Sequence, residues 1–228
     1  MQKRWSYSFI IGLALFVVCL AYIPQWRSYA PHIGESIPHS PYLTPWTVVS
    51  VTTLGLALAC VAASFRSGHP TQTIISKALA LVVLCFGAVF LLEYACGIRA
   101  PDLDIFFLPT ISGHRTTQYA ARPTPHSATT SLLFAVALLV LNRDSTWRMR
   151  AFLLSALGAL TLPTLAAAGY LFEFIFPPAQ PPAPRVGLSI PAVILYFTLG
   201  SGFLGLCRRP KNPKPALARP QKAFGRRM

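Results

Sequence analysis

Six runs of apolar residues, separated by polar or proline-rich segments, dominate the pattern of this 228-residue chain. Each run carries few charges and approaches the ~20 residues that an α-helix needs to cross the hydrocarbon of a bilayer. Backbone groups in lipid must be hydrogen-bonded internally, which favours helices. We therefore predict an all-α, multi-pass membrane bundle. Its helices are expected at residues 9–23, 47–65, 78–96, 125–141, 151–176 and 190–207.

Composition supports a membrane protein. The chain is 54% hydrophobic and only 11% charged, whereas soluble domains carry about 25% charged residues. This difference excludes an ordinary soluble enzyme, a disordered chain and a coiled coil. The net charge of +14 would suit nucleic acid or anionic lipid. Because the charges gather in the tail and in short loops, we expect membrane lipids as partners, and no nucleic acid.

The distribution of Lys and Arg predicts the orientation. With the N-terminus inside, fifteen of the 20 Lys and Arg residues fall in inner segments, which the positive-inside rule favours. We therefore expect both termini in the cytoplasm, in a bacterial inner membrane, and a retained first helix rather than a cleaved signal peptide. The tail, residues 208–228, is expected to be disordered and to contact lipid headgroups or a partner. Its basic residues are Arg208, Arg209, Lys211, Lys214, Arg219, Lys222, Arg226 and Arg227.

An internal repeat indicates a duplicated helical hairpin. The second and fourth helices open on Thr44-Pro-Trp-Thr and Thr124-Pro-His-Ser, and the sixth opens on the weaker match Leu188-Ser-Ile-Pro. Proline suits the first helical turn, and a hydroxyl there can cap a backbone N–H. The following helices end alike, on Leu92-Glu-Tyr and on Tyr170-Leu-Phe-Glu. We therefore expect one leading helix, two related hairpins and the start of a third.

The same repeat places two acidic residues at equivalent helix ends. Glu93 and Glu173 fall at the ends of the third and fifth helices, where a carboxylate is unfavourable because the helix dipole is negative there. We expect each to have a partner, with Arg99, Arg122 and His126 as candidates. The alternative is that both acids extend separately to the membrane interface.

Several segments resemble the multi-helix membrane sensor modules that precede bacterial histidine kinase, PAS and diguanylate cyclase domains. They are Thr44-Pro-Trp-Thr-Val48, Leu54-Gly-Leu-Ala-Leu58, Leu91-Leu-Glu-Tyr94, Asp102-Leu-Asp-Ile-Phe-Phe107 and Arg122-Pro-Thr-Pro-His-Ser-Ala128. The resemblance covers residues 40–207 and implies a sensor-like module. No output domain follows the sixth helix here, so signalling would need a separate partner.

Other chemistries are poorly supported. The stretch Thr110-Ile-Ser-Gly-His114 is similar to one in lipid-phosphate phosphatases, but the downstream His nucleophile of that chemistry is missing. All five His residues lie in loops or at a helix boundary, which disfavours haem. The five Cys residues form no C-x-x-C pair, which disfavours a dithiol centre or zinc. We expect no enzyme activity, no cofactor and no metal.

Two functions remain. The first is a non-catalytic sensor-like module that binds a lipid, a quinone or a small outer-side molecule and signals through a separate partner. The second is an accessory or assembly subunit of a larger inner-membrane complex, respiratory, photosynthetic or transport, bound to other integral membrane proteins. The residues predicted to bind a ligand are Trp46, Thr47, Glu93, Tyr94, His126, Ser127, Tyr170 and Glu173.

Overall fold

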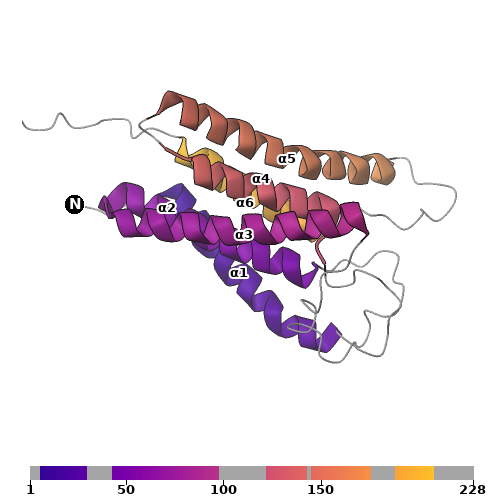
Figure 1. Ribbon diagram of the computed structural model, residues 1–228. Coiled ribbons are helices and arrows are strands. Elements are labelled where there is room, and N and C mark those ends of the chain that lie inside the picture. The colour runs from indigo at the N-terminus through magenta and orange to yellow at the C-terminus, as the bar shows by residue number, and fades with distance from the viewer. Residues whose placement is uncertain (1–5, 30–42, 98–121, 143–144, 176–187, 208–228) are drawn as a thin grey trace, which may run out of the picture.

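The part of the chain that the computed structural model describes is all-helical. It comprises residues 6–29, 43–97, 122–142, 145–175 and 188–207, and Figure 1 shows their arrangement. The helices are α1 (Tyr7–Tyr29), α2 (Pro45–Ser67), α3 (Pro70–Cys96), α4 (Pro125–Val140), α5 (Thr146–Ile175) and α6 (Ile190–Leu206). The all-α part of the predicted fold class is thus confirmed for these residues. The tail that was expected to contact lipid lies outside them.

Most helices extend beyond their apolar runs. The third helix begins at Pro70 rather than at residue 78, because a proline at the first position starts a helix well and Lys77 interrupts the apolar run without breaking the helix. Among the described residues, three helices, α2, α3 and α5, are long and apolar enough to cross a membrane. At 1.5 Å per residue, the 16 residues of α4 span about 24 Å, less than the ~30 Å of a typical hydrocarbon core.

The bundle has three inner and three outer helices. In the most apolar 18-residue stretch of each helix, 61% of the α2 residues are buried, against 28% for α3 and 22% for α5. In α4 and α6 about half of the residues are buried. Helix α1 buries one stripe, formed by Ser8, Gly12, Leu15 and Cys19, as expected of a helix that packs through one face. The first parts of α2, α4 and α6 lie together, so these inner helices run parallel to one another. The outer helices run the opposite way, because α3 and α5 end beside the starts of α4 and α6 and α1 begins beside the end of α6.

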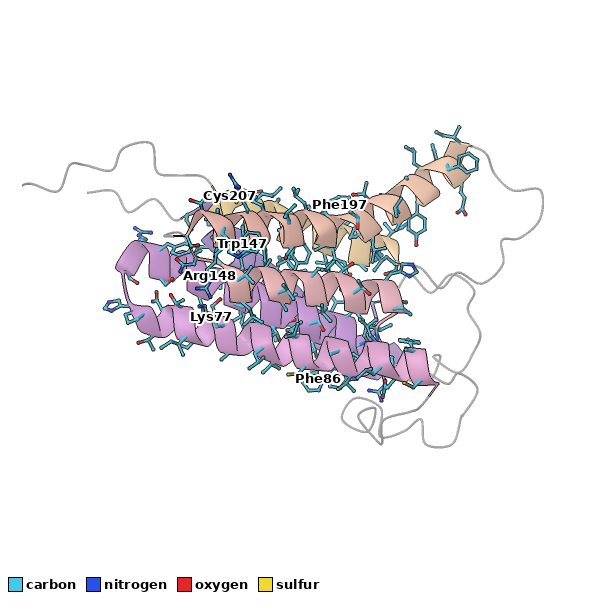
Figure 2. All side chains as sticks on the ribbon, turned by 45° about the horizontal axis from the view of Figure 1, so that its top comes forward. Lys77, Phe86, Trp147, Arg148, Phe197 and Cys207 are labelled. Carbon is cyan, nitrogen blue, oxygen red and sulfur yellow. The ribbon has the colours of Figure 1, made fainter. Side chains whose placement is uncertain are left out.

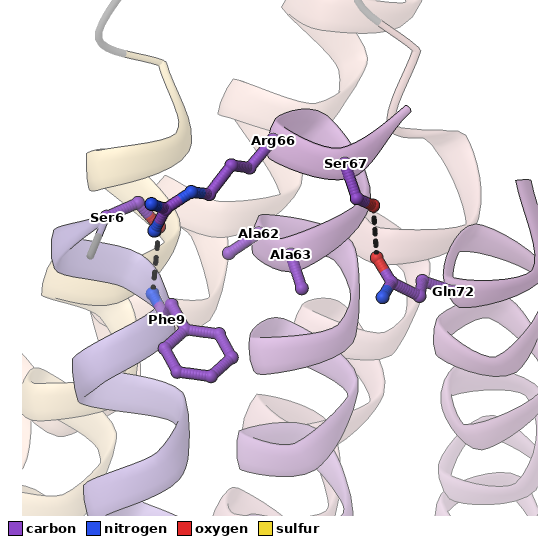
Figure 3. A pocket seen from close by; sticks show the side chains of 7 residues that line it. All are labelled: Ser6, Phe9, Ala62, Ala63, Arg66, Ser67 and Gln72. Atoms are coloured by element: carbon purple, nitrogen blue, oxygen red, sulfur yellow. Dashed lines mark hydrogen bonds between the residues drawn. The ribbon is translucent and has the colours of Figure 1, made fainter. Parts of the chain in front are cut away.

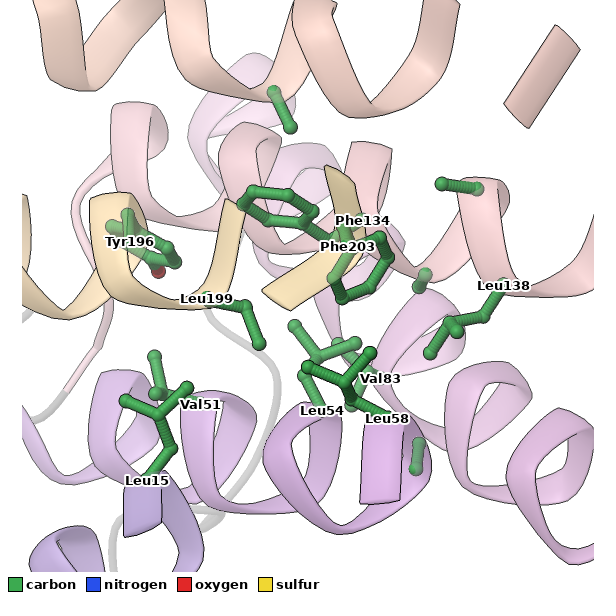
Figure 4. Close-up of a cluster of buried hydrophobic side chains, with 14 of the residues drawn as sticks. Leu15, Val51, Leu54, Leu58, Val83, Phe134, Leu138, Tyr196, Leu199 and Phe203 are labelled. Atoms are coloured by element: carbon green, nitrogen blue, oxygen red, sulfur yellow. The ribbon is translucent and has the colours of Figure 1, made fainter. Parts of the chain in front are cut away.

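Each outer helix packs between two inner helices. Helix α3 contacts α2 and α4, α5 contacts α4 and α6, and α1 contacts α6 and α2. The centre is filled by side chains such as Leu54, Phe134 and Phe203 (Figure 4). Phe134 and Phe203 bring α4 and α6 together with ring centroids 4.7 Å apart. The sixth helix, expected as the start of a third hairpin, therefore takes α1 as its outer partner.

Helix α1 crosses α2 at a pair of glycines. A Cβ atom at Gly12 would lie 2.5 Å from the carbonyl oxygen of Gly55 and 2.7 Å from the backbone nitrogen of Ala59. The two backbones therefore approach as closely as in the small-residue crossings of membrane helices. Even one added methyl group at Gly12 has no space without moving α1 away from α2.

We expect Gly12→Ala to destabilise the bundle by about 1–3 kcal/mol, the usual cost of overpacking. Gly169→Ala is the matched control, because no atom lies within 4 Å of a Cβ at Gly169. Thermal unfolding in detergent compares the two variants. An equal midpoint for both would contradict the close crossing.

Candidate functional site

The inner helices begin in the same way and at the same end of the bundle. Thr44, Thr124 and Ser189 are their N-caps, and each side-chain oxygen accepts a hydrogen bond from the backbone N–H three residues later. Proline stands at the first or second helical position in all three. The predicted capping by the repeated openings is confirmed, since hydroxyl and proline together leave fewer N–H groups unsatisfied.

A chain of hydroxyl groups connects the openings of α2 and α4 to Tyr196 on the second turn of α6. The Oγ1 atoms of Thr44 and Thr47 lie 2.7 Å apart, and Oγ1 of Thr47 lies 2.9 Å from Oγ of Ser127. Oγ of Ser127 is in turn 2.6 Å from the Tyr196 hydroxyl, which lies 2.8 Å from Oγ of Ser131. Apart from half-buried Thr44, these side chains are buried. The chain thus links α2, α4 and α6 through the centre of the bundle.

A buried ion pair lies at the same end, between α3 and α4. Nη2 of Arg122 donates to Oε1 of Glu93 over 3.1 Å, and the two side chains are only 1% and 4% exposed. The guanidinium carbon lies 5.0 Å from the ring centre of Phe90, within the range of a cation–π contact. Of the three expected candidates, Arg122 is the partner of Glu93. The carboxylate at the negative end of α3 is therefore compensated by a fixed positive charge.

Aromatic rings cover this ion pair. Trp46 on the first turn of α2 is buried, and its ring centre lies 5.0 Å from that of Phe86 and 5.2 Å from that of Phe90. Removing water from around Glu93 and Arg122 strengthens their attraction but makes the loss of either one costly.

Two tyrosines occupy equivalent places in the repeat. The Tyr94 hydroxyl donates to the backbone oxygen of Pro123 over 3.0 Å, and the Tyr170 hydroxyl donates to that of Leu188 over 2.6 Å. Each acceptor directly precedes the N-cap of the next inner helix. The ends of α3 and α5 are therefore each tied to the start of the inner helix that follows, and the sequence repeat corresponds to a structural one.

The remaining predicted residues lie at this end but in less enclosed places. His126 is exposed on the first turn of α4, and Glu173 is half-buried near the end of α5. Arg99 lies outside the described residues. The structure therefore brings Thr47 and Ser127 into direct contact. It groups Trp46 with Glu93 through Phe90 and Arg122.

Sequence reasoning missed Tyr196, whose hydroxyl lies within hydrogen-bonding distance of both Ser127 and Ser131. The signal was available in the repeat. Ala192 stands at the α6 position that corresponds to Thr47 in α2 and Ser127 in α4. A helical side chain leans toward the N-terminus, so Tyr196, one turn further on, supplies the hydroxyl that Ala192 lacks.

Within the described residues, no group of three or more His, Cys, Asp or Glu side chains is placed to hold a metal ion. The arrangement is instead a set of neutral hydroxyls and one compensated ion pair. Comparison with protein-family models, with curated protein sequences and with solved structures finds no match to this chain.

We expect Glu93→Gln to destabilise the fold by about 3–5 kcal/mol, the range found when one partner of a buried ion pair is removed. Glu173→Gln is the matched control, because Glu173 occupies the equivalent helix end but is only half-buried. Thermal or denaturant unfolding in detergent measures the stability of both variants.

The double variant Glu93→Gln, Arg122→Met should lose less unfolding free energy than the sum of the losses of the two single variants. Strict additivity would show that the pair is not coupled.

Proposed function

We propose that the chain is a multi-pass protein of a bacterial inner membrane, with all six helices crossing and both termini in the cytoplasm. The support is the distribution of exposed large apolar side chains in the described residues. They lie on α1, α3, α5 and α6, and none lies on α2 or α4. Water-soluble proteins rarely expose so much contiguous apolar surface, whereas lipid covers it. The short helices α4 and α6 fit if the bilayer thins locally around them.

Within that membrane we propose a non-catalytic, stand-alone sensor-like module. The observation that carries this function is the hydroxyl chain through Thr47, Ser127 and Tyr196, which joins three parallel helices. It lies at the outer end of the bundle, the end that the proposed orientation places outside the cell. Each such hydrogen bond contributes only about 0.5–1.5 kcal/mol net. A lipid, a quinone or a small molecule with polar groups of its own can therefore replace some of them, shift the inner helices and be detected by a partner protein.

A second candidate function is an accessory or assembly subunit of a larger membrane complex. It is favoured by the last turns of α5, where Leu171, Phe172, Phe174 and Ile175 are all exposed and Phe174 is 86% exposed. Figure 2 shows this end of α5 bending away from the rest of the bundle. Pro163 lies inside the helix and removes one of its backbone hydrogen bonds, which permits such a bend. A helix of another subunit could pack there.

We expect Cys96 to be reached from outside the cell and position 69 only from inside. Both positions are exposed, at the end of α3 and just before its start. The test uses two variants with one cysteine each, native Cys96 or an introduced His69→Cys, and a membrane-impermeant maleimide on intact and on permeabilised cells. Labelling of position 69 in intact cells would overturn the orientation. Protein that stays in solution without detergent would overturn membrane insertion.

Purification from native membrane in mild detergent, followed by mass spectrometry, separates the two functions. We expect a sensor module to purify largely alone and to retain a small molecule or lipid, with a kinase or cyclase present in less than equal amount. Equal amounts of several large membrane subunits would instead identify an accessory subunit and contradict an autonomous sensor.

A further inference from the structure

A cavity of about 220 Å³ opens at the end of the bundle opposite the hydroxyl chain. It lies between the start of α1, the end of α2 and the start of α3 (Figure 3). None of the residues discussed for the outer end contributes to it. Its lining is formed by Ser6, Phe9, Ala62, Ala63, Arg66, Ser67 and Gln72.

The cavity has an apolar floor and a polar rim. Helix α2 is an inner helix flanked by α1 and α3, and its small residues Ala62 and Ala63 form the floor beside the ring of Phe9. In Figure 3 the Arg66 side chain extends from α2 across the opening toward Ser6. Such a division suits a ligand with one charged and one hydrocarbon part.

Donor groups dominate the rim. The Ser67 hydroxyl donates to Oε1 of Gln72 over 2.9 Å, so the Nε2 amide of Gln72 remains available as a donor.

The surrounding charge is positive. Among the described residues the acids are Glu93 and Glu173, and both belong to the other end of the bundle. The end with the cavity carries Arg66, Lys77, Arg148 and Arg150; Figure 2 labels Lys77 and Arg148 toward that end of the bundle. An anion is therefore attracted to this end of the bundle.

We propose that this cavity binds the phosphodiester headgroup of an anionic phospholipid. The Arg66 guanidinium, which can donate two parallel hydrogen bonds to one phosphate, holds the headgroup. The acyl chains lie outward over the apolar floor, between α1 and α3. The volume is below the ~300–1,000 Å³ of pockets that enclose whole small molecules, so it accommodates the headgroup while the chains stay in the bilayer. This site requires membrane insertion but not sensing.

The test measures equilibrium binding of fluorescent phosphatidylglycerol to the full chain in detergent, with phosphatidylcholine of the same acyl chains and inorganic phosphate as competitors. Arg66→Gln removes the charge, and Ala63→Leu fills the floor while keeping the charge. Arg148→Gln is the matched control, because it lowers the positive charge of the same end outside the cavity. Thermal unfolding without lipid checks that each variant is folded.

We expect Arg66→Gln and Ala63→Leu each to weaken phosphatidylglycerol binding about tenfold, which corresponds to 1.4 kcal/mol, and Arg148→Gln to have little effect. Phosphatidylcholine should compete poorly. An equal loss of phosphatidylglycerol affinity in Arg66→Gln and Arg148→Gln would show that only the general positive charge of this end attracts the lipid, and it would overturn the site. Inorganic phosphate competing as well as lipid would overturn the lipid as its ligand. Neither result would bear on the proposed sensing, which concerns the outer end.

Discussion

Polar groups inside an apolar bundle have to satisfy one another, and this constraint determines how the inner helices are placed. Each of them begins with a hydroxyl cap and a proline, which reduces its unsatisfied N–H groups before any tertiary contact forms. The hydroxyls of Thr47 and Ser127 then have no water available and bond to each other and to Tyr196. Because these bonds join the openings of α2 and α4 to the second turn of α6, they fix the relative heights of the three helices.

Two of the outer helices, α3 and α5, are held in place at the same end of the bundle. Tyr94 and Tyr170 hold the ends of α3 and α5 against the residues that precede the next N-caps, and Arg122 adds a charged link from the start of α4 to Glu93. In the proposed membrane setting there is no hydrophobic driving force between helices, and such hydrogen bonds and close packing hold a bundle together. The opposite end of the bundle has shorter connections and basic residues, and it holds the proposed lipid cavity rather than a polar network.

Local signals in the sequence account for what could be predicted. Hydropathy gives the existence of six helices, and Thr or Ser before proline gives the openings of α2, α4 and α6. The partner of Glu93 was found among its candidates because a helix-end carboxylate has few ways to be compensated. Tyr196 was missed although the repeat leaves Ala192 where α2 and α4 have a hydroxyl. The aromatic cover from Phe86 and Phe90 was missed because nothing local distinguishes these rings from aromatics on the outside of the bundle. The side that a helix presents to its neighbours is decided by contacts between residues that are far apart in the chain.

The pairing of α6 with α1 is the feature that no local pattern predicts. Every other pair of neighbours in the ring is joined by a connecting segment, whereas α6 and α1 are held only by contacts. Those contacts are close. A Cβ at Gly202 would lie 2.8 Å from the Ile11 side chain, and one at Gly205 would lie 2.7 Å from Oγ of Ser8. The Tyr7 hydroxyl also donates to Oγ of Ser201 over 3.0 Å. The small residues of α6 thus serve packing within the chain, and they let α1 fill the place of an outer helix that a third hairpin would have supplied.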